Sequence, residues 1–153
     1  MTESYGVERW LPVVGFEGLY EVSDHGQVRS VDRYVDLANH PTLKGRTMKG
    51  RILYQKLNRP LAGGNYKRKQ VALWKNNQEY TKNVARLVAD AFLPNPHGFD
   101  WVLHLDDDAT NNHVSNLQWG DQAENVRQVV QRRRMPRGIK HHNWKHGKYS
   151  QTP

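Results

Sequence analysis

The segment that decides the fold reads WVLHLDDDATNNHVSNLQWG, from Trp101 to Gly120. Apolar residues begin and end it, and a polar stretch with three consecutive aspartates fills its middle. This pattern predicts a strand over residues 101–105, a polar loop over 106–113 and a second short strand within 114–119. Asp121, with Glu124 three residues later, is a capping-box pattern that predicts the start of a helix. We expect this helix to bury Val126, Val129 and Val130.

Two polar side chains flank this unit and suggest its chemistry. His104 ends the first expected strand and Asn125 lies in the first turn of the expected helix. A hairpin packed on a helix can bring them together although they are far apart in sequence. A neutral imidazole can take a proton from water, and a divalent cation can neutralise charge on a phosphate. Mg²⁺ needs only one or two protein oxygens, so the unit suits phosphodiester hydrolysis.

The chain before this unit predicts mostly strands. Alternation over residues 10–31 indicates a β-hairpin turning at Asp24 to Gly26, and residues 36–50 look like a loop or linker. Residues 52–57 and 66–74 are expected strands, the second followed by a hairpin turn at Asn76-Asn77. Residues 83–92 have apolar side chains at helical spacing, which predicts a short amphipathic helix before the prolines at 94 and 96. The aromatic residues expected in the core are Trp10, Phe16, Tyr20, Phe92 and Trp119.

The charge is distributed in blocks. The 153-residue chain has a formal net charge of +8. Residues 37–86 hold twelve basic side chains and one acidic one, residues 87–124 hold seven acidic and no basic ones, and residues 125–153 hold eight basic and no acidic ones. Basic blocks on both sides of an acidic segment predict a polyanionic partner. The candidate phosphate contacts are Arg51, Lys56, Lys67, Arg68, Lys69, Arg132, Arg133 and Arg134.

Composition excludes several classes of protein. A mean hydropathy of −0.90 and the lack of any long apolar run exclude a helical membrane span. The absence of cysteine excludes disulfides and thiolate zinc sites, so any metal must use nitrogen or oxygen ligands. Because no apolar run follows a basic start, we expect no secretory signal and a protein that works in the cytoplasm of a cell.

Three stretches resemble a known family. Residues 103–119, followed by Glu124-Asn125, resemble the HNH endonuclease motif of phage and intron-encoded homing enzymes. Residues 15–30, with Trp10 before them, are similar to the small nuclease-associated modular domain that often precedes this motif. Residues 86–96 are similar to the helix that leads into it. The three stretches stand in the expected order and cover about half of the chain.

The resemblance implies a role for several residues. His104 corresponds to the general base, Asn116 to the asparagine that braces the loop and so orients the histidine, and Asn125 to a metal ligand. The family usually has Asp or Asn before the histidine as a second metal ligand, where this chain has Leu103. The remaining ligands would be phosphate, water and Asp106 or another carboxylate of the loop.

We therefore expect an α+β protein with four segments. They are an N-terminal β-hairpin module (1–36), a basic β-rich DNA-binding region (37–83), a ββα-metal (HNH) nuclease core (84–130) and a basic tail (131–153). The expected function is hydrolysis of double-stranded DNA by a monomer that nicks one strand with one Mg²⁺ or Mn²⁺ ion, in the bacterial host of a phage or mobile element. Two alternatives stay open: a non-catalytic DNA-binding protein on a degenerate HNH scaffold, and an adaptor that binds RNA or a protein partner.

Overall fold

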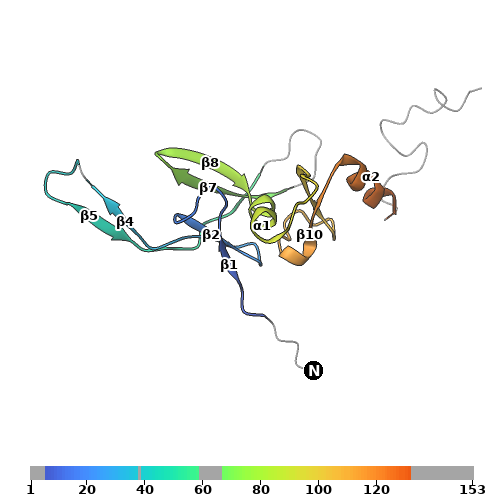
Figure 1. Ribbon diagram of the computed structural model, residues 1–153, viewed down its shortest axis with the longest axis horizontal. Helices are drawn as coiled ribbons and strands as arrows, with labels where there is room; N and C mark the ends of the chain where they lie inside the picture. Colours follow the sequence, from blue (N-terminus) through green and yellow to red (C-terminus); the bar gives the residue numbers. More distant parts are fainter. Residues whose placement is uncertain (1–5, 38, 59–66, 132–153) are drawn as a thin grey trace, which may run out of the picture.

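The computed structural model describes residues 6–37, 39–58 and 67–131 (Figure 1). They form several small antiparallel sheets and two α-helices, which confirms the α+β class. Helix α1 (Val84–Phe92) lies near the middle of the molecule in Figure 1. The hairpin of β4 (Arg33–Asp36) and β5 (Gly45–Met48) projects at one end, and α2 (Gln122–Gln131) lies toward the other. Neither helix in these ranges is long and apolar enough to cross a membrane.

The N-terminal sheet contains β1 (Trp10–Pro12), β2 (Tyr20–Ser23) and β3 (Val28–Ser30) in the order β1-β2-β3. The predicted hairpin is β2–β3, with Tyr20 paired with Ser30. Its turn needs glycine, because Gly26 has φ +82°, a left-handed conformation that other residues adopt only with strain. Sequence alternation therefore found both strands and the turn between them.

The prediction of a loop over residues 36–50 was wrong in part. Strands β4 (Arg33–Asp36) and β5 (Gly45–Met48) form an antiparallel hairpin, with Arg33 paired with Met48. The hairpin is largely exposed, and even the Tyr34 side chain is 65% accessible. A hairpin with no buried face has no alternation of apolar and polar residues, so only its glycines and proline were visible in the sequence.

The third sheet has the order β6-β7-β8, from β6 (Lys56–Leu57), β7 (Lys69–Lys75) and β8 (Gln78–Asn83). The strand expected over 52–57 is shorter than predicted, since only 56–57 join this sheet and Ile52 makes an isolated bridge to Arg29. The turn predicted at Asn76-Asn77 is confirmed. Both asparagines have positive φ, 52° and 60°, as a two-residue hairpin turn requires.

The core is built around α1 (Val84–Phe92). Val84 and Val88 have no accessible surface, and they belong to one cluster with buried residues of β2, β3 and β7 and with Leu117. Tyr20 connects two sheets, because its hydroxyl accepts from Trp74 N at 2.9 Å and donates to Trp74 O at 3.2 Å. Of the five aromatic residues expected inside, Phe16, Tyr20 and Trp119 are buried, and Trp10 and Phe92 are half-buried.

The segment after α1 has the predicted order of elements. Strand β9 (Trp101–His104) pairs with β10 (Leu117–Gly120), a short 3₁₀ helix η1 (Val114–Asn116) precedes β10, and α2 (Gln122–Gln131) follows it. The predicted cap is present, since Glu124 N donates to Asp121 Oδ1 at 2.7 Å. The Trp119 indole donates to Leu93 O at 3.1 Å and so fixes β10 to the end of α1.

The buried face predicted for α2 was wrong for two of its three valines. Val126 is 46% accessible and Val130 is 55% accessible, and the side chain of Val129 is not described. Helix α2 packs mainly against β10 and extends away from the α1 core (Figure 1). Apolar spacing predicts a helix correctly, but burial also needs a neighbouring surface, and the described part of the chain gives α2 little of one.

Candidate active site

His104 stands where β9 ends and the polar loop begins. It pairs with Leu117 across the β9–β10 ladder, and its ring is half-buried. The ring Nε2 lies 3.0 Å from Asn112 Oδ1. The backbone continues the ladder one residue further, since Leu105 N donates to Asn116 O at 2.9 Å. The imidazole is therefore held between a paired strand and the polar loop.

Asn116 holds the two ends of the loop together. It is 8% accessible, its Oδ1 accepts from Asp106 N at 3.0 Å, and its Nδ2 donates to Asp106 Oδ1 at 2.9 Å and to Asn111 O at 2.8 Å. One amide thus satisfies both sides of the loop with three hydrogen bonds. This is the geometry expected of a side chain that braces the loop next to His104.

The aspartates of the loop have defined hydrogen bonds. Asp106 Oδ1 also accepts from Asp108 N at 2.8 Å, and Asp106 Oδ2 accepts from Asn111 Nδ2 at 2.7 Å. The amide donors of Asn111 and Asn116 hold the pKa of the Asp106 carboxyl below its ordinary value. Bonds from the Thr110 hydroxyl and backbone N–H lower the pKa of Asp108 in the same way. Both side chains are exposed and favour their charged forms.

Leu103 lies on the side of the β9–β10 pair that faces α2. Side chains alternate along a strand, so Leu103 and His104 point to opposite faces. Leu103 is only 6% accessible. A Cβ on Gly120 would lie 2.6 Å from Leu103 Cδ1 and 3.5 Å from Glu124 Cβ, so Gly120 leaves room for the leucine beside α2. The position before the histidine is therefore packed with an apolar side chain.

Asn125 is on the first turn of α2, and its backbone N–H donates to Asp121 O at 3.0 Å. Its side chain is half-buried. Among the described residues, no hydrogen bond joins it to the loop. The fold therefore connects His104, Asp106 and Asn116 through the loop but leaves Asn125 on a separate element. In the same part of the chain, no three His, Asp or Glu side chains are grouped to hold a metal ion.

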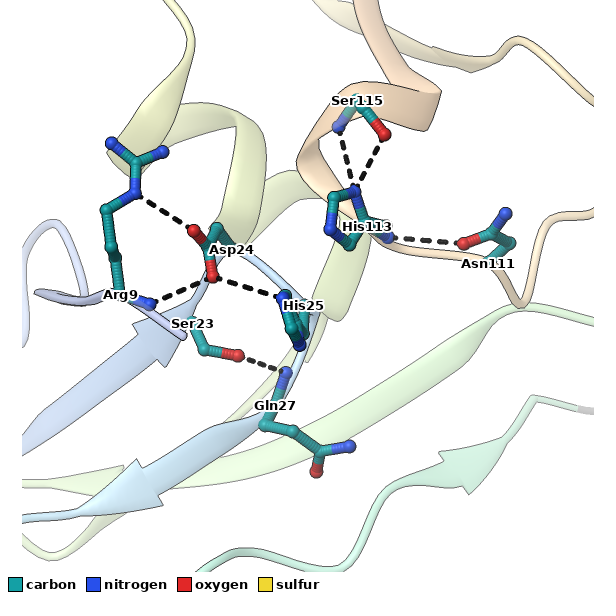
Figure 2. A network of polar contacts seen from close by, with 8 residues as sticks. All are labelled: Arg9, Ser23, Asp24, His25, Gln27, Asn111, His113 and Ser115. Atoms are coloured by element: carbon teal, nitrogen blue, oxygen red, sulfur yellow. Dashed lines mark hydrogen bonds and ion pairs between the residues drawn. The ribbon is translucent and has the colours of Figure 1, made fainter. Parts of the chain in front are cut away.

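The turn of the N-terminal hairpin packs against this loop (Figure 2). Val114 N donates to Asp24 O at 2.8 Å, and the His25 and His113 rings lie 4.9 Å apart between centroids. Burial opposes ionisation of Asp24, but bonds from the Arg9 side chain and backbone outweigh it and hold the pKa of the carboxyl below its ordinary value. The two units that resembled separate motifs in the sequence are in direct contact.

Two of the predicted phosphate contacts lie on the third sheet, and three more lie in segments between strands. Lys56 and Lys69 are on the paired strands β6 and β7, and they line an open groove together with Thr110 of the polar loop. Lys67 and Arg68 are exposed just before β7, and Arg51 is exposed beside Ser30, whose Oγ accepts from Arg51 N at 3.1 Å. Arg132, Arg133 and Arg134 lie outside the described residues.

Two features near His104 were not found from the sequence. One is the contact from Asn112, and the other is the packing of the Asp24–Gly26 turn on the loop. Asn112 looks like any loop asparagine in the sequence, yet it is only 4% accessible. Its burial depends on a turn about ninety residues earlier, and local patterns do not carry such long-range contacts.

Known proteins resemble the chain in both halves. The NUMOD4 motif matches residues 8–71. An uncharacterized HNH endonuclease of Acanthamoeba polyphaga mimivirus is 30% identical over 81% of this chain and 30% of its own length. The DNA endonuclease I-HmuI of Bacillus phage SP01 is 32% identical over 80% of this chain and 58% of its own length. The chain thus spans less than two thirds of each of these relatives.

A solved structure resembles the fold as well. It describes DNA binding and cleavage by the HNH homing endonuclease I-HmuI, and it superposes with a TM-score of 0.62 and 26% identity over 84% of this chain and 61% of that chain. The sequence comparison and the superposition thus both find similarity to I-HmuI. The chain is therefore similar in sequence and in fold to HNH homing endonucleases, and residues 8–71 in its N-terminal half match the NUMOD4 motif.

Proposed function

We propose that the chain is a DNA endonuclease that hydrolyses one phosphodiester bond with His104 as general base and one divalent cation. The observation that carries the proposal is the placement of His104 at the end of β9, beside a loop that Asn116 braces with three hydrogen bonds. The relative I-HmuI, whose structure is described as one of DNA binding and cleavage, supports the choice of DNA as substrate.

In this mechanism His104 takes a proton from a water molecule as that water attacks phosphorus in line with the leaving 3′ oxygen. Asn116 keeps the loop closed, so that the imidazole stays at a fixed position relative to the strand. A bound Mg²⁺ or Mn²⁺ would supply positive charge beside the scissile phosphate and the leaving oxygen. One such site acts on one strand, so we expect a monomer to nick double-stranded DNA.

The residues present fit a sparse cation site. Asn125 would supply an amide oxygen, and Asp106 would supply a carboxylate that is already held in its charged form. A carboxylate has about four acceptor positions, and the hydrogen bonds from Asp108 N, Asn111 Nδ2 and Asn116 Nδ2 use three of those of Asp106. Mg²⁺ commonly keeps several waters and binds one or two protein oxygens, which matches this small donor set.

A second function is favoured by one observation. Leu103 is buried at the position before the histidine, where a carboxylate would have been a further ligand. A chain of this kind could retain the scaffold and its basic surface and bind DNA without cutting it. Both functions include DNA binding, and only the first includes DNA cleavage.

A supercoiled-plasmid assay separates them. We expect the wild type to nick plasmid in Mg²⁺ or Mn²⁺ and not in EDTA. His104→Ala should lower the rate by about 10²- to 10⁴-fold, the usual contribution of a general base. The matched control is His97→Ala, which removes an exposed histidine outside the loop and should nick at the wild-type rate. Retention of DNA with no nicking in either metal would favour the binding protein.

The DNA-binding surface is tested by salt dependence. Lys56→Ala and Lys69→Ala should each reduce the slope of log K against log[salt] by about 0.9, as expected for one lost phosphate contact. The control is Lys49→Ala, whose ammonium is already paired with Asp32 at 2.8 Å. Gel-shift titrations at several salt concentrations measure the slopes. Equal slopes for all three variants and the wild type would show that the DNA does not contact the β6–β7 groove.

A further inference from the structure

Asn112 is a buried polar side chain that the mechanism above does not use. It is 4% accessible and belongs to the loop between β9 and η1. Its Oδ1 lies 3.0 Å from His104 Nε2. Its Nδ2 is also buried and has no hydrogen-bond partner among the described residues. Leaving a buried amide donor unpaired costs about 1–3 kcal/mol, so the Asn112 side chain is not placed there to stabilise the fold. Its hydrogen bond is the one to His104.

The direction of this hydrogen bond determines where His104 carries its proton. An amide oxygen only accepts, so Nε2 of a neutral His104 must be the protonated nitrogen. The lone pair then lies on Nδ1. A general base needs a free lone pair at a fixed position, and a ring that exchanged tautomers would present it only part of the time.

Asn112 is itself held by the N-terminal module. A Cβ on Gly26 would lie 2.8 Å from Asn112 Cβ and 3.0 Å from Asn112 O, so the turn approaches the Asn112 backbone as closely as a glycine allows. The next two residues also contact the turn. Val114 N donates to Asp24 O at 2.8 Å, and the His113 ring lies 4.9 Å from the His25 ring at an angle of 38° (Figure 2 shows both rings). The carboxamide of Gln55 donates to Gly26 O at 2.8 Å and holds the turn from its other side.

We propose that Asn112 is a positioning residue that keeps His104 in the Nε2–H tautomer, and that the Asp24–Gly26 turn keeps Asn112 in place. The NUMOD4 segment then has a second task besides any contact with DNA, because it forms part of the support of the general base. The catalytic consequence rests on the proposed function. The tautomer does not, since it is a property of the free protein.

The tautomer is tested first, by long-range proton–nitrogen NMR correlations of the His104 ring in the full chain at about pH 8, where histidine is neutral. Wild type and Asn112→Asp, which keeps an acceptor oxygen, should show the proton on Nε2. Asn112→Leu, which removes the acceptor, should show a mixture of tautomers. A wild-type proton on Nδ1, or an Asn112→Leu spectrum identical to wild type, overturns the proposal. This readout needs no cleavage, so it stays decisive if the chain proves not to be a nuclease.

The consequence for cleavage is tested with the plasmid assay. Asn112→Leu should lower kcat by about 10²-fold with little change in KM, because a misplaced base affects the chemical step rather than DNA binding. Asn112→Asp should recover at least part of that loss. An Asn112→Leu variant that nicks at the wild-type rate would show that Asn112 does not position the base.

Two glycines provide a matched pair for the turn. Gly26→Ala and Gly18→Ala introduce the same strain at positive φ, +82° and +76°, but only Gly26 lies against another segment, since a Cβ on Gly18 would meet nothing within 4 Å. We expect Gly26→Ala to disturb the His104 tautomer and lower kcat, and Gly18→Ala to change neither. Thermal unfolding of both variants shows whether they are folded at the assay temperature. Equal effects in the two folded variants would overturn the role of the turn.

Discussion

The two halves of the candidate site are built in different ways. The loop that carries His104 and Asn116 is closed by its own hydrogen bonds and lies against the N-terminal turn. Helix α2, which carries Asn125, packs mainly on β10 and leaves Val126 half-exposed. The side of the site that would hold the base is therefore organised by the fold alone. A cation would be held by Asp106 of the loop and by Asn125 of α2, and the α2 side offers only this amide beside the buried Leu103, so its geometry depends more on what binds there.

The largest test of this difference is Leu103→Asp. Burying a carboxylate at a position that is 6% accessible should lower the free energy of unfolding by more than about 3 kcal/mol without metal. If Leu103 occupies a ligand position, Mg²⁺ or Mn²⁺ should restore part of that loss and raise the nicking rate. Thermal unfolding in metal and in EDTA measures the first effect, and the plasmid assay measures the second.

The control for this test is Leu103→Ala, which makes a cavity but adds no ligand. It should be destabilised by about 2–4 kcal/mol in metal and in EDTA alike. If metal stabilises the aspartate variant no more than the alanine variant, then no cation site exists beside α2. That result would favour a protein that binds DNA without cutting it.

The second test compares the two asparagines. Asn116→Ala removes three hydrogen bonds from a side chain that is 8% accessible, so it should cost about 2–3 kcal/mol of stability and also reduce nicking. Asn125→Ala should change stability by less than about 0.5 kcal/mol, because the hydrogen bond from Asn125 N to Asp121 O belongs to the backbone and is kept in the variant. Its nicking rate should still fall if the amide holds the cation.

Denaturant unfolding and the plasmid assay on both variants give the two effects separately. An Asn125→Ala variant as unstable as Asn116→Ala would show that the helix is fixed by its side chain. A stable Asn125→Ala variant that nicks at the wild-type rate would remove Asn125 from the set of ligands.

The sequence predicted the parts of the fold that local patterns determine. The β2–β3 hairpin, the turn at Asn76-Asn77 and α1 were visible because each has a buried face or a residue suited to positive φ. The β4–β5 hairpin was missed because its side chains are largely exposed. Local patterns thus reveal an element when one of its faces is buried, and they lose it when none is.

The site was predictable to a similar extent. His104 stands out at the end of an expected strand, and Asn116 was singled out only by the resemblance to the HNH motif. Their roles as base and brace remain predictions. Asn112 and Gly26 could not be paired from the sequence, because their contact joins two distant turns and neither residue has an unusual local pattern. Residues that act through tertiary contacts are therefore the hardest to predict from a single sequence.

The smallest test concerns the apolar side of α2. Val126 is 46% accessible, so Val126→Ala should change the free energy of unfolding by less than about 0.5 kcal/mol. Val88→Ala on α1 removes the same two methyl groups from a position with no accessible surface and should cost about 2 kcal/mol, because it leaves a cavity. Both changes replace valine by alanine within a helix, so the change in helix propensity is nearly the same in the two variants. The difference between their unfolding free energies therefore measures packing. A loss above about 1 kcal/mol for Val126→Ala would show that this side of α2 is covered in the folded protein, and the contrast between an organised base and a loosely held α2 would no longer stand.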